Sequence, residues 1–410
     1  MERLLISRLA LLAAILPSLA CAELQLNAGF DVGIVDGGPL PSFQDGSMGK
    51  LRYGKHDDGL QLLNGYLQVQ SDVQAVWDGK IVLDVNSQAD NPVGVSEAVL
   101  QFRPLPVGGV RFRAKLGAFR PPISFEHGAN GWETLYTTNA SAINSWAGEE
   151  LGGVGLEVVA KRDLASSGSN SYWSAGGALF YGNDPAGTLL SWRGWSINNW
   201  QTRWGGDVKL AELPVFQFAP DQDHASEPFL ELDNRPGFYL WGEIGNAGRF
   251  RSRVLYYDNR ADMDASGHGQ SGWRTRFWSL SAQLALPWDF GLIGQWMDGS
   301  TYFGPVRDGR RVLDNHFDAY FLLLTRTLGS HRFSARHDWF GVDDENFSPI
   351  DPNNEDGTAW TLSYQYRLNE NWLFGVEWIE IDSTRPARVF AAEPIALTER
   401  GWFLVSRWRL

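Results

Sequence analysis

The sequence predicts a transmembrane antiparallel β-barrel, and three observations support this fold class. Apolar and polar residues alternate with a period of two along many segments, which is the pattern of strands with two different faces. These segments run to about ten residues and carry Trp and Tyr near their ends, as in the aromatic girdles of outer-membrane barrels. Short and long connections also alternate along the chain.

The first 22 residues have the three parts of a secretory signal peptide: a basic start, a short apolar run, and a small-x-small site that ends at Ala22. Cys21 raises the alternative of a lipoprotein, but Ser18-Leu19-Ala20 fits that signal poorly. We therefore expect a signal peptide over residues 1–22 and an exported barrel over residues 23–410. Its location would be the bacterial outer membrane.

Composition excludes several classes of protein. A net charge of −13 argues against a nucleic-acid partner, and export argues the same independently. After the signal peptide no stretch is apolar enough for a membrane helix. Cleavage would remove the only cysteine, so disulfides cannot stabilise the exported chain.

Two segments place basic residues on one face of a predicted strand and apolar residues on the other. The first, "VRFRAKLGAF", sets Arg111, Arg113 and Lys115 against an apolar face. The second, "GRFRSRVLYYDN", does the same with Arg249, Arg251 and Arg253, and Arg332 and Arg336 are weaker candidates for the same wall. A solvated edge strand of a soluble sheet would show the same local pattern, but the rest of the chain favours a barrel with a water-filled lumen. We predict that its basic wall contains Arg111, Arg113, Lys115, Arg249, Arg251, Arg253, Arg332 and Arg336.

The connections allow the strands to be counted. The short joins fall at residues 77–80, 104–109, 245–248, 287–290, 328–331 and 368–371, and the long ones at 36–60, 120–152, 258–273, 299–314, 342–357 and 382–400. Counting from both ends gives seven strands before residue 183 and nine after residue 236. The total is sixteen if residues 183–236 form one outer loop, and eighteen is the alternative. The last strand ends on Leu410 rather than on an aromatic residue, but otherwise resembles the C-terminal signal for barrel assembly.

The segments "LGAFRPPISFE" and "SAINSWAGEELGGVGLE", which contain the two ends of the connection at 120–152, resemble the phosphate-selective porins of the O and P family. The resemblance is specific over about residues 110–160 and architectural elsewhere. It implies a trimeric 16-stranded channel with a basic ladder on the wall and a third loop that folds inward as a constriction. The chain departs from the family in having six lysines and 29 arginines, which puts phosphate selectivity in doubt because arginine holds oxyanions more rigidly.

The third loop carries four glutamates that would oppose the basic wall. Two interpretations are open: they face the pore and create a transverse field, or they pair with arginines and pin the loop. We expect Glu126 and Glu133 to be pore residues and Glu149 and Glu150 to be a pinning pair.

Other candidate sites are weaker. Residues 262–273 follow the order of the first half of a calcium loop, but the twelfth position is Trp273 rather than Glu, so an acidic outer loop is the better interpretation. His331 and His337 lie near Asp338 without a clear serine partner, so an enzyme is not expected. We predict no catalytic residue, no metal and no cofactor.

The sequence thus predicts a porin that admits small hydrophilic solutes or anions by passive diffusion. Its expected partners are outer-membrane lipid and two further copies of itself, in a homotrimer. The alternatives are a non-conducting structural barrel, a barrel enzyme, and a sugar-selective porin. The last is suggested by the loop aromatics Trp132, Tyr136, Trp146, Trp192 and Trp195.

Overall fold

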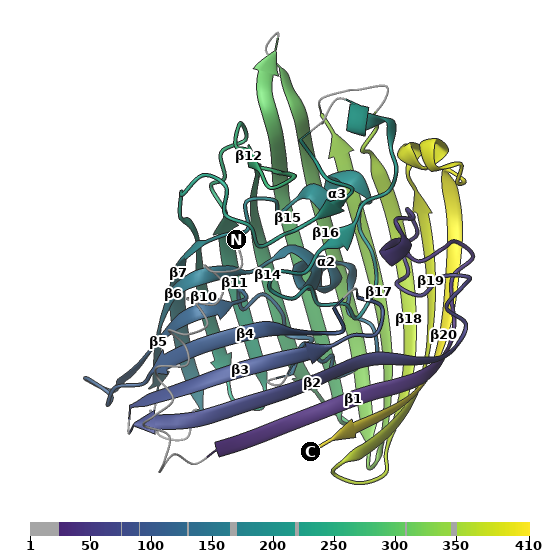
Figure 1. Ribbon diagram of the computed structural model, residues 1–410. Helices are drawn as coiled ribbons and strands as arrows, with labels where there is room; N and C mark the ends of the chain where they lie inside the picture. Colours follow the sequence, from purple (N-terminus) through teal and green to yellow (C-terminus); the bar gives the residue numbers. More distant parts are fainter. Residues whose placement is uncertain are drawn as a thin grey trace.

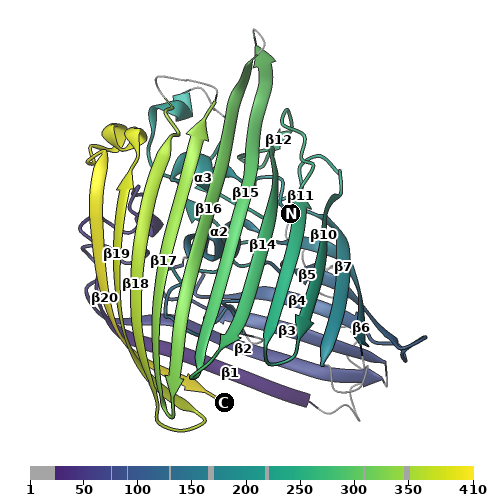
Figure 2. The same ribbon diagram turned by 180° about the vertical axis from the view of Figure 1, so that it is seen from behind.

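The computed structural model describes residues 24–74, 76–89, 91–128, 131–164, 170–217, 221–307, 310–345 and 351–410. Sixteen strands form one closed antiparallel barrel (Figure 1, Figure 2). The strands are β1 (Leu24–Asp36), β2 (Gly59–Gln74), β3 (Trp77–Val85), β4 (Val93–Phe102), β5 (Val110–Phe119), β6 (Gly153–Leu164), β7 (Ser171–Tyr181), β10 (Gly237–Asn246), β11 (Phe250–Asp258), β14 (Trp273–Leu286), β15 (Phe290–Arg307), β16 (Arg310–Leu328), β17 (His331–Asp344), β18 (Glu355–Arg367), β19 (Trp372–Thr384) and β20 (Ala396–Arg409).

The barrel closes between its first and last strands. β1 pairs with β20 from Gly29 opposite Arg409 to Asp36 opposite Trp402. Every other barrel strand pairs with the barrel strands before and after it in chain order, so no strand of the barrel has an open edge. The predicted signal peptide, residues 1–22, lies outside the described residues.

The described residues between β7 and β10 add no strand to the barrel. Its two short strands, β8 (Val208–Lys209) and β9 (Ala225–Ser226), form a small sheet of their own. Seven barrel strands therefore precede this connection and nine follow it. The predicted count of sixteen is confirmed, and the alternative of eighteen is wrong.

Long connections gather at one end of the barrel, the long-loop end, and short turns at the other, the short-turn end, where the C-terminus lies (Figure 1). The long connections carry η2 (Phe43–Asp45), α2 (Ala142–Glu150), α3 (Thr188–Trp192), η3 (Pro214–Gln217), β12 (Ser266–Gly267), β13 (Gln270–Ser271) and η4 (Pro386–Ala391). We call residues 120–152 the third loop and residues 182–236 the fourth loop.

Two predicted connections are misplaced. The first join falls between Gln74 and Trp77, not at 77–80, because Asp78 stays in β3 with its carboxylate 2.7 Å from the Arg103 guanidinium. The long loop predicted at 299–314 is instead an extension of the β15–β16 hairpin, which projects beyond the other strands (Figure 1). A shift of register after Phe303 accommodates Pro305, which cannot donate a backbone hydrogen bond.

The outer face of the barrel is apolar at alternate positions of the strands. Val254, in the middle of β11, keeps 44% of its surface exposed, whereas Leu255 beside it keeps 1%. Because successive side chains of a strand point to opposite faces, this contrast distinguishes the outer face of the barrel from its inner face. Other exposed apolar residues on the strands include Leu116, Leu156, Leu179, Leu240, Ile244, Leu280, Trp296, Leu322, Leu324, Leu362, Val376 and Leu404.

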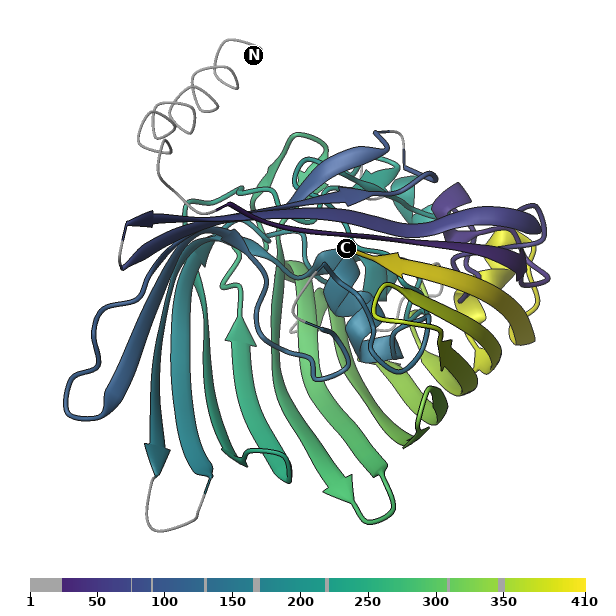
Figure 3. The ribbon, with the colours of Figure 1, turned by 90° about the horizontal axis from the view of Figure 1, so that it is seen from below.

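The third and fourth loops fill much of the interior. Figure 3, viewed from the short-turn end, shows helical segments inside the ring of strands. All nine residues of α2 are buried, and its first turn is capped by Ser141, whose hydroxyl accepts from the Asn144 N–H. Trp146 packs against Trp195 of the fourth loop and against Phe317 of the wall, with ring centroids 5.9 and 5.4 Å away. No helix among the described residues is long and apolar enough to cross a membrane.

Candidate functional site: the barrel interior

β11 carries the arginine row on its inner face. The Arg253 guanidinium forms an ion pair with Glu243 of β10, and it also donates to the Pro122 carbonyl of the third loop. The Arg251 Nε donates to Gln283 at 2.7 Å, and its guanidinium lies 4.0 Å from the ring centroid of Phe125 in the same loop. Arg249 precedes the strand, at the short-turn end, and is exposed.

The basic residues of β5 divide into paired and unpaired groups. Lys115 lies 3.1 Å from Glu157 of β6, and Arg111 lies 2.7 Å from Asp163. Arg113 lies between them on the same face, is exposed, and forms no ion pair with a described carboxylate. The three side chains therefore have the alternation expected from the sequence but unequal electrostatic roles.

On β17 the two candidate arginines also differ. Arg336 is fully buried, with its guanidinium 2.7 Å from Asp338 and 3.1 Å from Glu126. It also donates to the carbonyls of Asn139 and Ala140. The third loop therefore covers Arg336, and this side chain does not meet lumen water as the pore-lining prediction requires.

Arg332, nearer the short-turn end, is partly exposed. It donates to the Leu135 carbonyl, and its guanidinium lies 5.4 Å from the ring centroid of Tyr136. It forms no ion pair with a described carboxylate. Arg332 therefore contacts the third loop without losing its charge to an acid.

The four loop glutamates all have partners. Glu126 is buried, bound by Arg336 and by the Ser141 backbone N–H at the start of α2. Glu133 lies 3.1 Å from Arg407 and also pairs with Arg409. For Glu126 and Glu133 this geometry matches the pinning alternative, rather than the expectation that they face an open pore.

Glu149 and Glu150 connect the third loop to the fourth. Glu149 accepts from Arg193 at 2.6 Å. Glu150 has no cationic partner among the described residues and instead accepts from the Leu189 N–H at 2.9 Å and the Trp146 Nε1 at 2.5 Å. Burial raises the pKa of Glu150 to about 7. The pair holds α2 to α3 rather than to the barrel wall.

Several interior residues were not singled out from the sequence. Glu377 of β19 accepts from the backbone N–H groups of Thr138 and Asn139, and Arg407 and Arg409 hold Glu133. The alternation of β19 and β20 puts these charges on the inner face, which is a usable signal. It does not reveal that the third loop would meet them.

The four unpaired cations of the predicted basic wall share one location. Arg113, Arg249, Arg251 and Arg332 all lie at or near the starts of strands that run from the short-turn end toward the long-loop end. None forms an ion pair with a described carboxylate. Unneutralised charges on the wall of a narrow lumen raise the local concentration of counter-ions, because the low-dielectric wall focuses their field.

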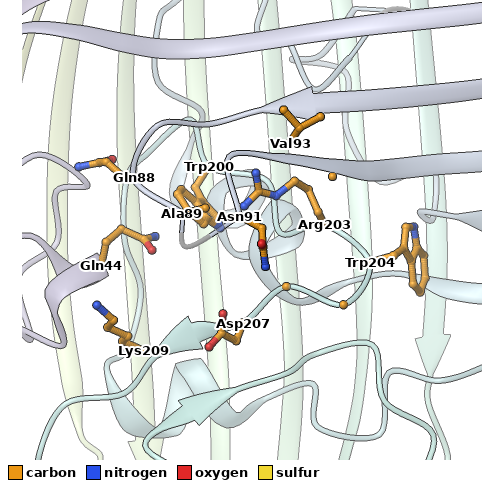
Figure 4. A pocket seen from close by; sticks show the side chains of 13 residues that line it. Gln44, Gln88, Ala89, Asn91, Val93, Trp200, Arg203, Trp204, Asp207 and Lys209 are labelled. Carbon is orange, nitrogen blue, oxygen red and sulfur yellow. The ribbon is translucent and has the colours of Figure 1, made fainter. Parts of the chain in front are cut away.

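Two small cavities flank the filled region. One, of about 220 Å³, opens between the first, second and fourth connections and is lined by Trp200, Arg203, Trp204, Asp207 and Lys209 together with amide side chains (Figure 4). The other, of about 210 Å³, lies between the third loop and β3–β5 and is lined by Glu97, Lys115, Arg120 and His127. Both cavities are polar and lie on the β2–β6 side of the barrel. The residues that bind the third loop, such as Arg336, Glu377 and Arg407, lie on the opposite side, on β17–β20.

The aromatics that suggested a sugar site are mostly inaccessible. Trp146, Trp192 and Trp195 are buried, whereas Trp132 and Tyr136 are partly exposed. Trp132 stacks on His127, with ring centroids 3.9 Å apart.

The residues considered for catalysis are not brought together. The His337 ring packs against the exposed Trp360 on the outer face, whereas Asp338 points inward to Arg336. His331 lies 2.8 Å from the Tyr364 hydroxyl near the short-turn end. These residues therefore do not form a triad.

Comparison with solved structures shows the same fold in outer-membrane proteins. The chain is similar to OmpT of Vibrio cholerae in a trimer form, with a TM-score of 0.52, 11% identity, and coverage of 95% of this chain and 99% of that one. The outer membrane channel DcaP of Acinetobacter baumannii matches with a TM-score of 0.53 and 11% identity, over 95% of this chain and 97% of that one. An anion-selective porin from Comamonas acidovorans matches with a TM-score of 0.50 and 11% identity, over 95% of this chain and 100% of that one. No protein-family model and no curated protein sequence matches this chain. The chain thus has the closed barrel fold of outer-membrane channels.

Proposed function

We propose that this chain is an outer-membrane porin, a passive diffusion channel for small hydrophilic solutes that acts without cofactor or catalytic residue. The observation that carries the proposal is the closed barrel with an apolar outer face, an inward third loop, and unpaired arginines on its inner wall. Lipid contacts the outer face, and export by the predicted signal peptide brings the chain to the outer membrane. A homotrimer is proposed from the family resemblance and from the trimer form of the Vibrio cholerae relative.

The proposed selectivity favours anions. Arg113, Arg249, Arg251 and Arg332 leave positive charge unneutralised at the short-turn end, while the remaining candidate cations are paired. The anion-selective porin among the structural relatives and the resemblance to phosphate-selective porins support this direction. Phosphate itself is a weaker candidate, because guanidinium forks bind oxyanions in a bidentate manner that slows release.

Planar bilayer recording tests both parts of the proposal. The purified protein is expected to form channels, and a salt gradient should give a reversal potential on the anion-selective side. Replacing Arg113, Arg249, Arg251 and Arg332 with Gln should shift that potential toward cation preference, since lumen substitutions tune selectivity. Arg253 is left unchanged because its loss would leave the buried Glu243 without its ion-pair partner.

Arg326→Gln is the matched control. Arg326 lies at the same end of the barrel on the outward-facing register of Leu322 and Leu324. The Arg326→Gln substitution removes one positive charge outside the lumen, so the reversal potential should stay the same. A protein that is folded but never conducts refutes the porin proposal, whereas conduction with the same reversal potential in the fourfold variant refutes only the anion preference.

A sugar-selective porin is the second candidate, favoured by the cavity at the long-loop end. Trp200 and Trp204 flank a space that also contains amide side chains, a combination typical of sites for polar ligands (Figure 4). Solutes that block current separate the two candidates: a neutral disaccharide should block the sugar channel, and inorganic anions should block the anion channel.

A further inference from the structure

We propose that Ca²⁺ binds between Asp184, Glu231 and Asp233 and joins the two ends of the fourth loop. One carboxylate oxygen from each residue lies within 4.8 Å of the others. Asp184 follows the end of β7 at Tyr181, and the other two precede the start of β10 at Gly237. The inference is independent of the solute that the barrel admits.

A buried oxygen without a partner points to a ligand in this cluster. Asp184 is only 1% exposed, and its Oδ2 accepts from the Leu232 N–H at 2.6 Å. Its Oδ1 is buried and accepts no hydrogen bond from a described residue. A buried carboxylate oxygen is costly without a donor or a cation, so this atom calls for one or the other.

The described residues around the cluster supply no cation. Within the described part of the chain, Glu231 and Asp233 accept only from backbone N–H groups, namely those of Gly182, Asn234, Arg235 and Asp262. The guanidinium of Arg235 is turned away to the Asp262 carboxylate at 2.6 Å. Among the described residues, no side chain neutralises the three carboxylates, and burial with the repulsion of Glu231 and Asp233 raises the pKa of Asp184 to about 7.

The donor set fits a hard divalent cation with flexible coordination. Carboxylate oxygens are the main protein ligands of Ca²⁺, which takes about six to eight oxygens at variable angles and can complete its shell with water. Mg²⁺ needs near-octahedral geometry and gives up water reluctantly, so Ca²⁺ is the better match for three carboxylates on a loop.

The position of the site gives the ion a structural role. The fourth loop carries α3 and Trp195 into the lumen, and the Trp195 Nε1 donates to the Gly341 carbonyl of the wall at 2.9 Å. Joining the two ends of a long loop removes conformational freedom that would otherwise oppose its docking. Bound Ca²⁺ would therefore hold the lumen-filling loop in place.

Calcium binding to the folded, chelator-treated protein in detergent micelles tests the proposal. Titration calorimetry near pH 8 should show one Ca²⁺ per chain. Tb³⁺ should displace it and luminesce on excitation of Trp273, whose backbone N–H donates to the Asp184 carbonyl at 2.7 Å. Glu231→Gln and Asp233→Asn should each weaken binding by at least about tenfold, because affinity follows the number of charged ligands. Asp264→Asn, an exposed acid in the neighbouring connection, is the matched control and should bind normally.

Two results would overturn the proposal. One is a wild-type protein that binds no Ca²⁺, and the other is a Glu231→Gln/Asp233→Asn variant that binds Ca²⁺ as tightly as wild type. Either result leaves the porin proposal untouched, because the measurement is not of conductance.

Discussion

Replacing Arg336 with Met should release the third loop from the barrel wall. Arg336 is fully buried and pairs with both Glu126 and Asp338 while donating to the loop carbonyls of Asn139 and Ala140. Its removal leaves two carboxylates buried and unpaired, a change that costs about 3–5 kcal/mol. A loss of this size corresponds to roughly a 10²–10⁴-fold shift in the docking equilibrium of the loop.

The barrel itself should survive, because its strand pairing does not involve Arg336 side-chain contacts and Glu377 still holds the loop. The expected results are a larger, noisier single-channel conductance and faster protease cleavage within the third loop. Arg326→Met, which removes an arginine from the outward-facing register of β16, is the control and should behave as wild type. Adding Glu126→Gln and Asp338→Asn should restore much of the docking, because it removes the two buried carboxylates that have lost their arginine partner. Unchanged conductance and cleavage in Arg336→Met would show that the pairing does not hold the loop.

Two further predictions concern the faces and ends of the barrel. Val254→Arg puts a charge on the outer face in the middle of β11, the face that we propose contacts lipid. It should destabilise the inserted barrel by roughly 2–4 kcal/mol in urea unfolding from vesicles, whereas Val254→Leu should change the stability little. Equal stability of the two variants would reverse the assigned faces. A protease site inserted at the exposed Gly205 should be cut in intact cells, whereas one at Ala247, in a short turn, should be protected. The opposite pattern would contradict an orientation with the long loops outside the cell.

The fold was predictable because its signals are local. Alternation along each strand and the length of each connection gave the strand count without any long-range information. The two misplaced connections occurred at residue pairs that usually mark a turn or loop but here lie within a strand. Asp-Gly at residues 78–79 predicts a turn, but an ion pair to Arg103 keeps Asp78 in a strand. Gly304-Pro305 predicts a loop, but a bulge carries the hairpin past it.

The interior was less predictable because its contacts are non-local. Arg251 and Arg336 have the same alternation in the sequence, yet the first is partly exposed and the second is buried. The difference is made by Glu126, which lies 210 positions from Arg336 along the chain. The convergence of Asp184 with Glu231 and Asp233 is of the same kind, since it exists only when both ends of the fourth loop meet.

The arginines of the inner wall can bind the inward-folded loop or contribute positive charge to the pore, and both roles use the same guanidinium group. A loop folded into a barrel brings backbone polar groups away from water, and these must find partners. Arg336 donates to the carbonyls of Asn139 and Ala140, and Glu377 accepts from the N–H groups of Thr138 and Asn139. Each arginine used in this way is neutralised by a nearby carboxylate and contributes little to the field of the pore. Arg113, Arg249, Arg251 and Arg332 have no carboxylate partner among the described residues and lie at the short-turn end, so we expect them to contribute most to the anion preference proposed above. An anion that entered from the long-loop end would meet these four side chains last.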